Sequence, residues 1–157
     1  MSNHELKEGD SAPEIHLPDD KGADFRLSAL HGQTVVLYFY PKADTPGCTK
    51  ESCEFRDNTQ KFAKKDTVIV GVSPDKSAAQ SKFKAKFDLP FTLLADTDHT
   101  AAESYGVWKE KSMYGKKYMG IERTTFLIGP DGKIRRIFHK VKPEGHAEEV
   151  YAALEAI

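Results

Sequence analysis

The stretch Thr34-Val-Val-Leu-Tyr-Phe-Tyr40 is a continuous apolar run that ends at Pro41. A run of this kind predicts a strand buried on both faces, as in sheets that carry helices on each side. The next residues, Lys42-Ala-Asp-Thr-Pro-Gly-Cys48-Thr-Lys-Glu-Ser-Cys53, have the features of a helix start. Thr45 is a favourable N-cap residue, and Pro46 suits the first helical position. A buried strand therefore leads directly into a helix that carries both cysteines of the chain.

Strand and helix patterns alternate along the rest of the chain. We expect a hairpin over 13–28, strands over 34–40, 67–72 and 91–94, helices over 46–64, 77–87 and 98–105, a second hairpin of strands 124–128 and 133–138 around the turn 130–132, and a last helix over 143–157. This order predicts an α/β, thioredoxin-like fold, with a central mixed β-sheet flanked by helices and an N-terminal β-hairpin. No repeat, low-complexity tract or linker divides the sequence, so we expect residues 1–157 to form a single domain.

Composition excludes several classes of function. The chain has 157 residues, a hydrophobic content of 39% and a formal net charge of -1. Without a strongly basic surface, nucleic acid and anionic membranes are not expected partners. No apolar run reaches the roughly 18 residues of a membrane-spanning helix, and residues 1–10 lack the apolar core of a secretory signal. Two cysteines are too few for a disulfide-stapled secreted scaffold, so we expect a cytoplasmic protein.

The helix start is a favourable place for a thiolate. Cys48 falls at the third helical position, where backbone N–H groups lack intrahelical partners and the helix dipole favours an anion. Cys48, Phe55 and Phe62 recur every seven residues, so we expect them to share the face that packs on the sheet. Cys48 should therefore be partly sheltered but accessible at the carboxyl end of the preceding strand, where sites form in such sheets. Gly47 should leave room for a small substrate to approach the backbone.

The spacing of the second cysteine limits the chemistry. Cys53 should lie about 140° further round the helix, with its α-carbon roughly 8 to 9 Å from that of Cys48. A disulfide requires roughly 4.4 to 6.8 Å. The two thiols therefore cannot bond while the helix is intact, and if they pair in a reaction cycle, the first turns must unwind.

The same residues resemble a known family. Pro41, Thr45 and Cys48 match the proline–threonine–cysteine signature of peroxiredoxins, and the phrase from Tyr38 to Glu51 is similar to that of the peroxiredoxin Q branch, also called bacterioferritin comigratory protein. The resemblance covers nearly the whole chain, including Leu27-Ser28, Gly32, Val70–Ser73, Ser104–Trp108 and Arg123–Ile128.

The resemblance implies a thioredoxin-dependent peroxidase that reduces hydrogen peroxide and organic hydroperoxides, in antioxidant defence and redox homeostasis. It implies a peroxidatic Cys48 that passes through a sulfenic acid, and a resolving Cys53 that forms a disulfide with it. By resemblance, the remaining site residues are Thr45 and Arg123, which position and polarise the peroxide, Glu51, which orients the arginine, and the supporting Pro41 and Gly47. Thioredoxin, or glutaredoxin, is the implied reductant. The implied enzyme is a monomer without a cofactor.

The chemistry of a thiol peroxidase asks for donors beside the thiolate. The thiolate attacks one peroxide oxygen, and the other leaves as an alkoxide or hydroxide. Donors aimed at that developing charge contribute on the order of a hundredfold or more each. The candidates are the Cys48 amide, the Thr45 hydroxyl and the Arg123 guanidinium, and arginine suits this task because it stays charged and holds its donors in a fixed plane.

Other interpretations stay open. A thioredoxin-like dithiol reductase needs a Cys-x-x-Cys pair, but Glu51 occupies the position three after Cys48. A structural Cys53 would leave a one-cysteine peroxidase, and a redox sensor would share the first oxidation step. A zinc module would need about four ligands, which two cysteines without a nearby histidine do not supply. The histidines are scattered, and we expect surface or capping positions for His4, His16, His31, His99, His139 and His146.

Overall fold

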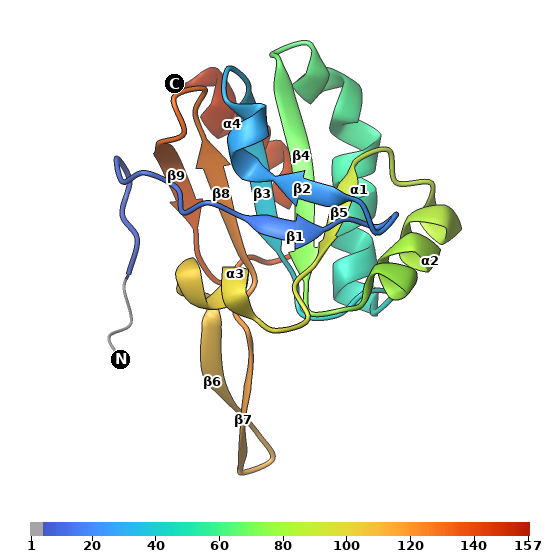
Figure 1. The fold of residues 1–157 in the computed structure, drawn as a ribbon. Coiled ribbons are helices and arrows are strands. Elements are labelled where there is room, and N and C mark those ends of the chain that lie inside the picture. The colour runs from blue at the N-terminus through green and yellow to red at the C-terminus, as the bar shows by residue number, and fades with distance from the viewer. Residues whose placement is uncertain (1–4) are drawn as a thin grey trace.

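A computed structural model describes residues 5–157, and its centre is a five-stranded sheet in the order β5-β4-β3-β8-β9 (Figure 1). Its strands are β3 (Thr34–Phe39), β4 (Thr67–Ser73), β5 (Thr92–Ala95), β8 (Thr124–Ile128) and β9 (Ile134–Phe138). The first three run parallel, while β8 and β9 are antiparallel to their neighbours. The predicted mixed sheet is therefore confirmed.

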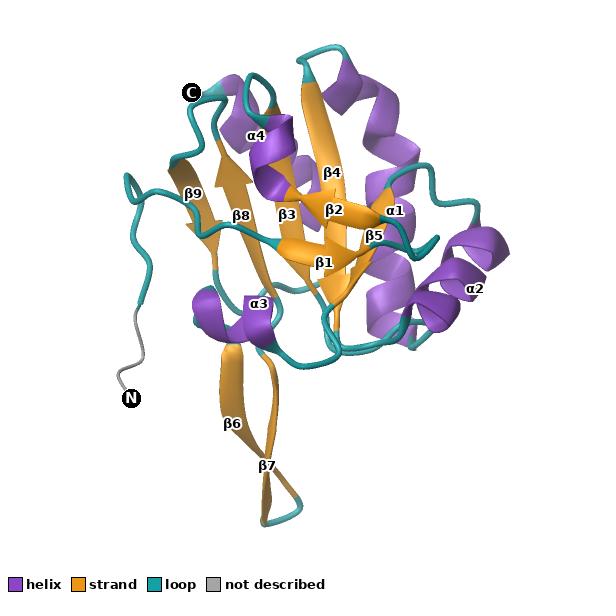
Figure 2. Cartoon of the chain, in the orientation of Figure 1, coloured by secondary structure: helices purple, strands orange, loops and turns teal. Residues whose placement is uncertain are grey.

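Helices and a hairpin cover the two faces of this sheet (Figure 2). One face carries α1 (Pro46–Ala63), α2 (Ser77–Phe87) and α4 (His146–Glu155). The other face carries the hairpin of β1 (His16–Pro18) and β2 (Asp24–Arg26), the 3-10 helix η1 (Leu27–Leu30) and α3 (Thr100–Ser104). The arrangement is the thioredoxin-like fold predicted from the sequence, including its N-terminal hairpin.

The apolar run of β3 separates two hydrophobic cores. All six of its residues are buried. Because side chains alternate along a strand, Val35, Leu37 and Phe39 enter the core under the hairpin and α3, whereas Val36 and Tyr38 enter the core under α1 and α4. Cys48, Phe55 and Phe62 of α1 belong to this second core, so the face predicted for them is confirmed.

A further hairpin, beyond the two predicted from the sequence, was missed. It consists of β6 (Trp108–Met113) and β7 (Lys116–Ile121), and it projects away from the body of the molecule (Figure 1). Most of its residues are exposed or half-buried, so no apolar alternation marks it. In its two-residue turn, Tyr114 and Gly115 both have positive φ, at 53° and 78°, as tight hairpins require. The signal for this turn in the sequence was Gly115, because glycine adopts positive φ readily.

The last helix was predicted to begin at residue 143, but it begins at His146. Gly145 precedes it with a φ of 78°, a left-handed conformation that an α-helix does not contain. Within residues 5–157, none of the helices is long and apolar enough to cross a membrane. The same part of the chain contains no group of three or more His, Cys, Asp or Glu side chains arranged to hold a metal ion.

Candidate active site

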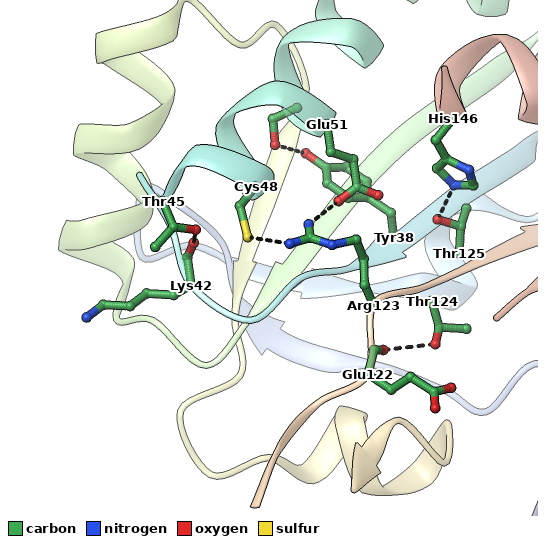
Figure 3. Close-up of polar contacts among 11 residues, drawn as sticks. Tyr38, Lys42, Thr45, Cys48, Glu51, Glu122, Arg123, Thr124, Thr125 and His146 are labelled. Carbon is green, nitrogen blue, oxygen red and sulfur yellow. Dashed lines mark hydrogen bonds and ion pairs between the residues drawn. The ribbon is translucent and has the colours of Figure 1, made fainter. Parts of the chain in front are cut away.

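Strand register brings the predicted site residues together. In the antiparallel pair of β3 and β8, Phe39 lies opposite Thr124. Arg123, directly before β8, therefore lies beside the end of β3, where the chain passes through Pro41 into α1. Figure 3 shows the consequence, because the side chain of Arg123 extends toward Cys48 although 75 positions separate them.

Arg123 joins two side chains of α1. Its Nη1 donates to Glu51 Oε1 at 2.7 Å, and its Nη2 lies 3.4 Å from Cys48 Sγ (Figure 3). Residues three apart lie on the same side of a helix, so one planar guanidinium reaches both. Three of the predicted site residues thus form one connected group, with a cation held beside the thiol by a buried carboxylate.

Glu51 is the least solvated member of this group. Its side chain is fully buried, and its Oε2 has no hydrogen-bond partner in the described part of the chain. Burial raises the pKa of Glu51 from 4.5 to about 7, although the charge and hydrogen bond of Arg123 act in the opposite direction. Burial by itself would lower the pKa of Arg123, but Glu51 and Cys48 raise it above its ordinary value. Near neutral pH, Glu51 therefore gains or loses its proton while Arg123 stays charged, and the net charge of this pair changes.

The expectation of an accessible Cys48 was wrong, because this residue is 0% exposed. The start of α1 is covered by Arg123 and by the loop before α4. A Cβ placed on Gly47 would lie 3.2 Å from Arg123 Nη2 and 3.5 Å from Pro143 Cγ. The space that Gly47 was expected to offer a substrate is thus filled by the arginine. A molecule from solvent can reach the sulfur only when side chains around the helix start move.

Thr45 occupies the N-cap position with extended backbone, as predicted, but its side chain does not cap the helix. Its Oγ1 donates instead to the carbonyl oxygen of Lys42 at 2.8 Å (Figure 3). The hydroxyl proton is therefore engaged, while the oxygen can still accept a hydrogen bond. The Thr49 N–H bonds the Thr45 carbonyl at 2.8 Å, so the amides of Gly47 and Cys48 precede the first bonded turn.

Both cysteines are free thiols within one continuous helix. Cys53 is half-buried, on a different side of α1 from Cys48. The structure thus shows the intact-helix state in which, by helix geometry, the two sulfurs cannot bond.

Two contacts that the sequence did not reveal fasten this part of α1. Tyr38 Oη and Ser52 Oγ are 2.8 Å apart, and both residues are fully buried. Glu54 Oε1 accepts the N–H of Gly145 at 2.9 Å, which ties α1 to the start of α4. Both pairs join residues far apart in the chain, so no local pattern identifies them.

The surface or capping position expected for His146 was also wrong, since this residue is 1% exposed. Its Nε2 lies 2.8 Å from Thr125 Oγ1 and its Nδ1 2.8 Å from Glu149 Oε1. Burial lowers the pKa of His146, although Glu149 opposes this. The available signal was the apolar spacing of Ala147 and Val150, which places His146 on the inner side of α4.

Comparison with known proteins agrees with this geometry. Residues 9–137 match the AhpC/TSA family. Peroxiredoxin Bcp of Bacillus subtilis is 49% identical over 147 residues, covering 94% of each chain. Peroxiredoxin Bcp of Escherichia coli is 48% identical over 145 residues, covering 92% of this chain and 93% of the relative.

Solved structures agree as well. Xanthomonas campestris peroxiredoxin Q superposes with a TM-score of 0.87 at 42% identity, covering 90% of each chain. Xylella fastidiosa PrxQ superposes with a TM-score of 0.91 at 37% identity, covering 96% of each. The chain therefore belongs to the AhpC/TSA family of peroxidases, in its peroxiredoxin Q (Bcp) branch.

Proposed function

We propose that this chain reduces hydrogen peroxide and organic hydroperoxides with Cys48 as the peroxidatic nucleophile. The observation that carries the proposal is the contact of Cys48 Sγ with Arg123, which Glu51 holds in place. The guanidinium beside the sulfur faces the position where negative charge develops on the peroxide, and it can stabilise that charge. The similar bacterioferritin comigratory protein of Xanthomonas campestris has alkyl peroxide reduction activity, which supports organic hydroperoxides as substrates.

In the first step, the Cys48 thiolate attacks one oxygen of the peroxide. The sulfur–oxygen bond forms as the oxygen–oxygen bond breaks, and the second oxygen leaves as an alkoxide or hydroxide that takes up a proton. Arg123 stabilises that leaving charge together with the amides of the first turn. Thr45 acts as an acceptor for the peroxide O–H, because its own proton is engaged by Lys42. Pro41 and Gly47 serve as supporting residues that shape the turn and admit the arginine.

In the second step, the Cys53 thiol attacks the sulfenic sulfur of Cys48. A disulfide forms, and the sulfenic oxygen leaves as water with the thiol proton. The first turns of α1 unwind for this step, since the intact helix keeps the sulfurs apart. A dithiol reductant, thioredoxin or glutaredoxin, then reduces the disulfide by exchange. An intrachain pair needs no second subunit, so we assign a monomer of one domain over residues 1–157.

Coupled NADPH oxidation through thioredoxin reductase and thioredoxin tests this function, with hydrogen peroxide and two organic hydroperoxides compared. We expect multiple turnovers for the wild type and none for Cys48→Ser. Cys53→Ser should consume one equivalent and leave a sulfenic acid that dimedone traps at Cys48. Peroxide turnover by Cys48→Ser would remove Cys48 from the role of nucleophile. A wild type that is oxidised only once, even with thioredoxin present, would indicate a redox sensor instead.

A further inference from the structure

Tyr38 and Ser52 form a buried contact outside the group of Cys48, Glu51 and Arg123. Tyr38 lies on β3, and its Oη is 2.8 Å from the Oγ of Ser52 on α1. Both side chains are completely buried. The tyrosine ring is fixed by packing on Phe55, with ring centroids 4.8 Å apart, and on Tyr40, at 5.4 Å. A rigid strand thus holds a hydroxyl of the helix at a fixed point inside the core.

Ser52 directly precedes Cys53, in the segment that the second step of the proposed function must move. Within an intact helix the α-carbons of Cys48 and Cys53 are roughly 8 to 9 Å apart, and a disulfide requires roughly 4.4 to 6.8 Å. The chain between them therefore has to leave its helical path. Ser52 cannot do so while its hydroxyl stays bonded to Tyr38 on the sheet.

Two other contacts hold the same part of α1, but they differ in kind. Glu51 binds Arg123 and so belongs to the active site. Glu54 accepts the N–H of Gly145, a contact between exposed groups. Of these three contacts, the Tyr38–Ser52 bond is the one that is neutral and completely buried, and within the described residues no hydrogen bond joins it to Cys48 or Arg123. Buried neutral bonds persist because a hydroxyl that loses its partner inside the core is unfavourable.

We infer that the Tyr38–Ser52 hydrogen bond is a latch that keeps residues 48–53 helical and thereby sets the rate at which Cys53 reaches the oxidised Cys48. Tyr38 and Ser52 are positioning residues, since neither touches the peroxide. The inference rests on the proposed function for its consequence, namely the rate of disulfide formation. If the Tyr38–Ser52 bond opens slowly, the sulfenic acid persists for longer, and a second peroxide can then oxidise it to a sulfinic acid.

The chain offers a matched control for this inference. Tyr40 lies on the same strand continuation, is equally buried, and donates from its Oη to Gln80 Oε1 at 2.6 Å. Gln80 belongs to α2, so the Tyr40 bond does not hold the moving segment. Tyr38→Phe and Tyr40→Phe each remove one buried hydroxyl and keep the ring. Only the first should release α1.

The test has two measurements on reduced wild type, Tyr38→Phe, Ser52→Ala, the double variant and Tyr40→Phe. The first is amide hydrogen exchange of residues 49–54, which reports opening of the helix without any cysteine chemistry. Loss of one hydrogen bond should raise the exchange rate about fivefold in Tyr38→Phe and Ser52→Ala. The double variant should open no more than either single variant, since both act through one bond. Tyr40→Phe should match the wild type over these residues.

The second measurement follows sulfenic acid and disulfide by quenched mass spectrometry after one equivalent of hydrogen peroxide. Disulfide formation should accelerate by the same factor of about five in Tyr38→Phe and Ser52→Ala, while sulfenic acid forms at the wild-type rate. Unchanged amide exchange in both variants would overturn the latch. Faster exchange with unchanged disulfide formation would overturn its control of the reaction. If the wild type forms no Cys48–Cys53 disulfide at all, the second step of the proposed function fails, and the exchange measurement still decides whether the latch exists.

Discussion

Replacing Glu51 by glutamine should change how the stability of this protein depends on pH. Burial raises the pKa of Glu51 from its ordinary 4.5 to about 7, with Arg123 opposing and Glu54 adding a small further increase. In the pH range between these two values, the unfolded chain has lost this proton while the folded chain keeps it. Raising the pH therefore favours the unfolded state, and stability falls as pH rises.

The magnitude follows from the two pKa values. A difference between 4.5 and about 7 corresponds to about 3 kcal/mol, at about 1.4 kcal/mol per pKa unit. No discount for solvent applies, because the Glu51 side chain is fully buried. The wild type should thus lose about 3 kcal/mol relative to Glu51→Gln between pH 4.5 and pH 8, with most of the change complete once the pH passes about 7.

Urea unfolding of both proteins, followed by circular dichroism with the thiols kept reduced, measures this difference at half-unit steps of pH. Other titrating groups, including His146, are present in both proteins and cancel in the comparison. We expect the free energy of unfolding of Glu51→Gln minus that of the wild type to rise steadily up to about pH 7 and then level off. A difference that stays flat across this range would refute the assignment of a protonated, buried Glu51 below neutral pH.

Three further predictions concern the same region. Arg123→Lys should lower the second-order rate constant for reaction with peroxide about 100-fold, because a lysine lacks the planar set of donors that contacts both Glu51 and Cys48. Stopped-flow kinetics measures this rate constant, and a loss smaller than about threefold would contradict the prediction. Burial lowers the pKa of His146, so the unfolded chain binds a proton more readily than the folded chain, and the wild type should lose stability as the pH falls below about 6.5. His146→Gln should not show this loss. Thermal melting at pH 7.5 and 5.5 measures this, and an equal shift in both proteins would argue against it. Phe55→Ala should destabilise the fold by about 3 to 5 kcal/mol, because the ring is completely buried between Tyr38 and Phe62; chemical denaturation with a smaller effect than about 1 kcal/mol would show that the core closes over the cavity.

Local patterns in the sequence predicted the elements whose own residues show an apolar run or a regular apolar spacing. The apolar run of β3 and the seven-residue spacing of Cys48, Phe55 and Phe62 indicated a two-sided sheet and the inner face of α1, and both are present. The hairpin of β6 and β7 was not predicted, because almost all of its residues are exposed or half-buried and its strands lack a buried apolar face. Apolar periodicity in a sequence therefore predicts the elements that pack on the core, and it does not mark exposed ones.

The site shows a similar division. The residue types and spacing of Thr45, Cys48 and Glu51 are local, and they predicted which side chains gather at the helix start. The complete burial of Cys48 depends on Arg123, which arrives through the pairing of β8 with β3. The partner of Ser52 arrives from β3 in the same way. Contacts of this kind depend on register between distant strands, which a single sequence does not display.

One measurement tests the central claim most directly. Reduced protein receives one equivalent of hydrogen peroxide without any reductant, and intact and peptide mass spectrometry then locate the oxidised sulfurs. We predict that the wild type loses two hydrogens and yields a single crosslinked peptide joining Cys48 to Cys53, whereas Cys53→Ser gains one oxygen on Cys48 and Cys48→Ser stays unchanged. Oxidation of Cys48→Ser at Cys53 at the wild-type rate, or a wild type that gains oxygen without forming this crosslink, would contradict the claim.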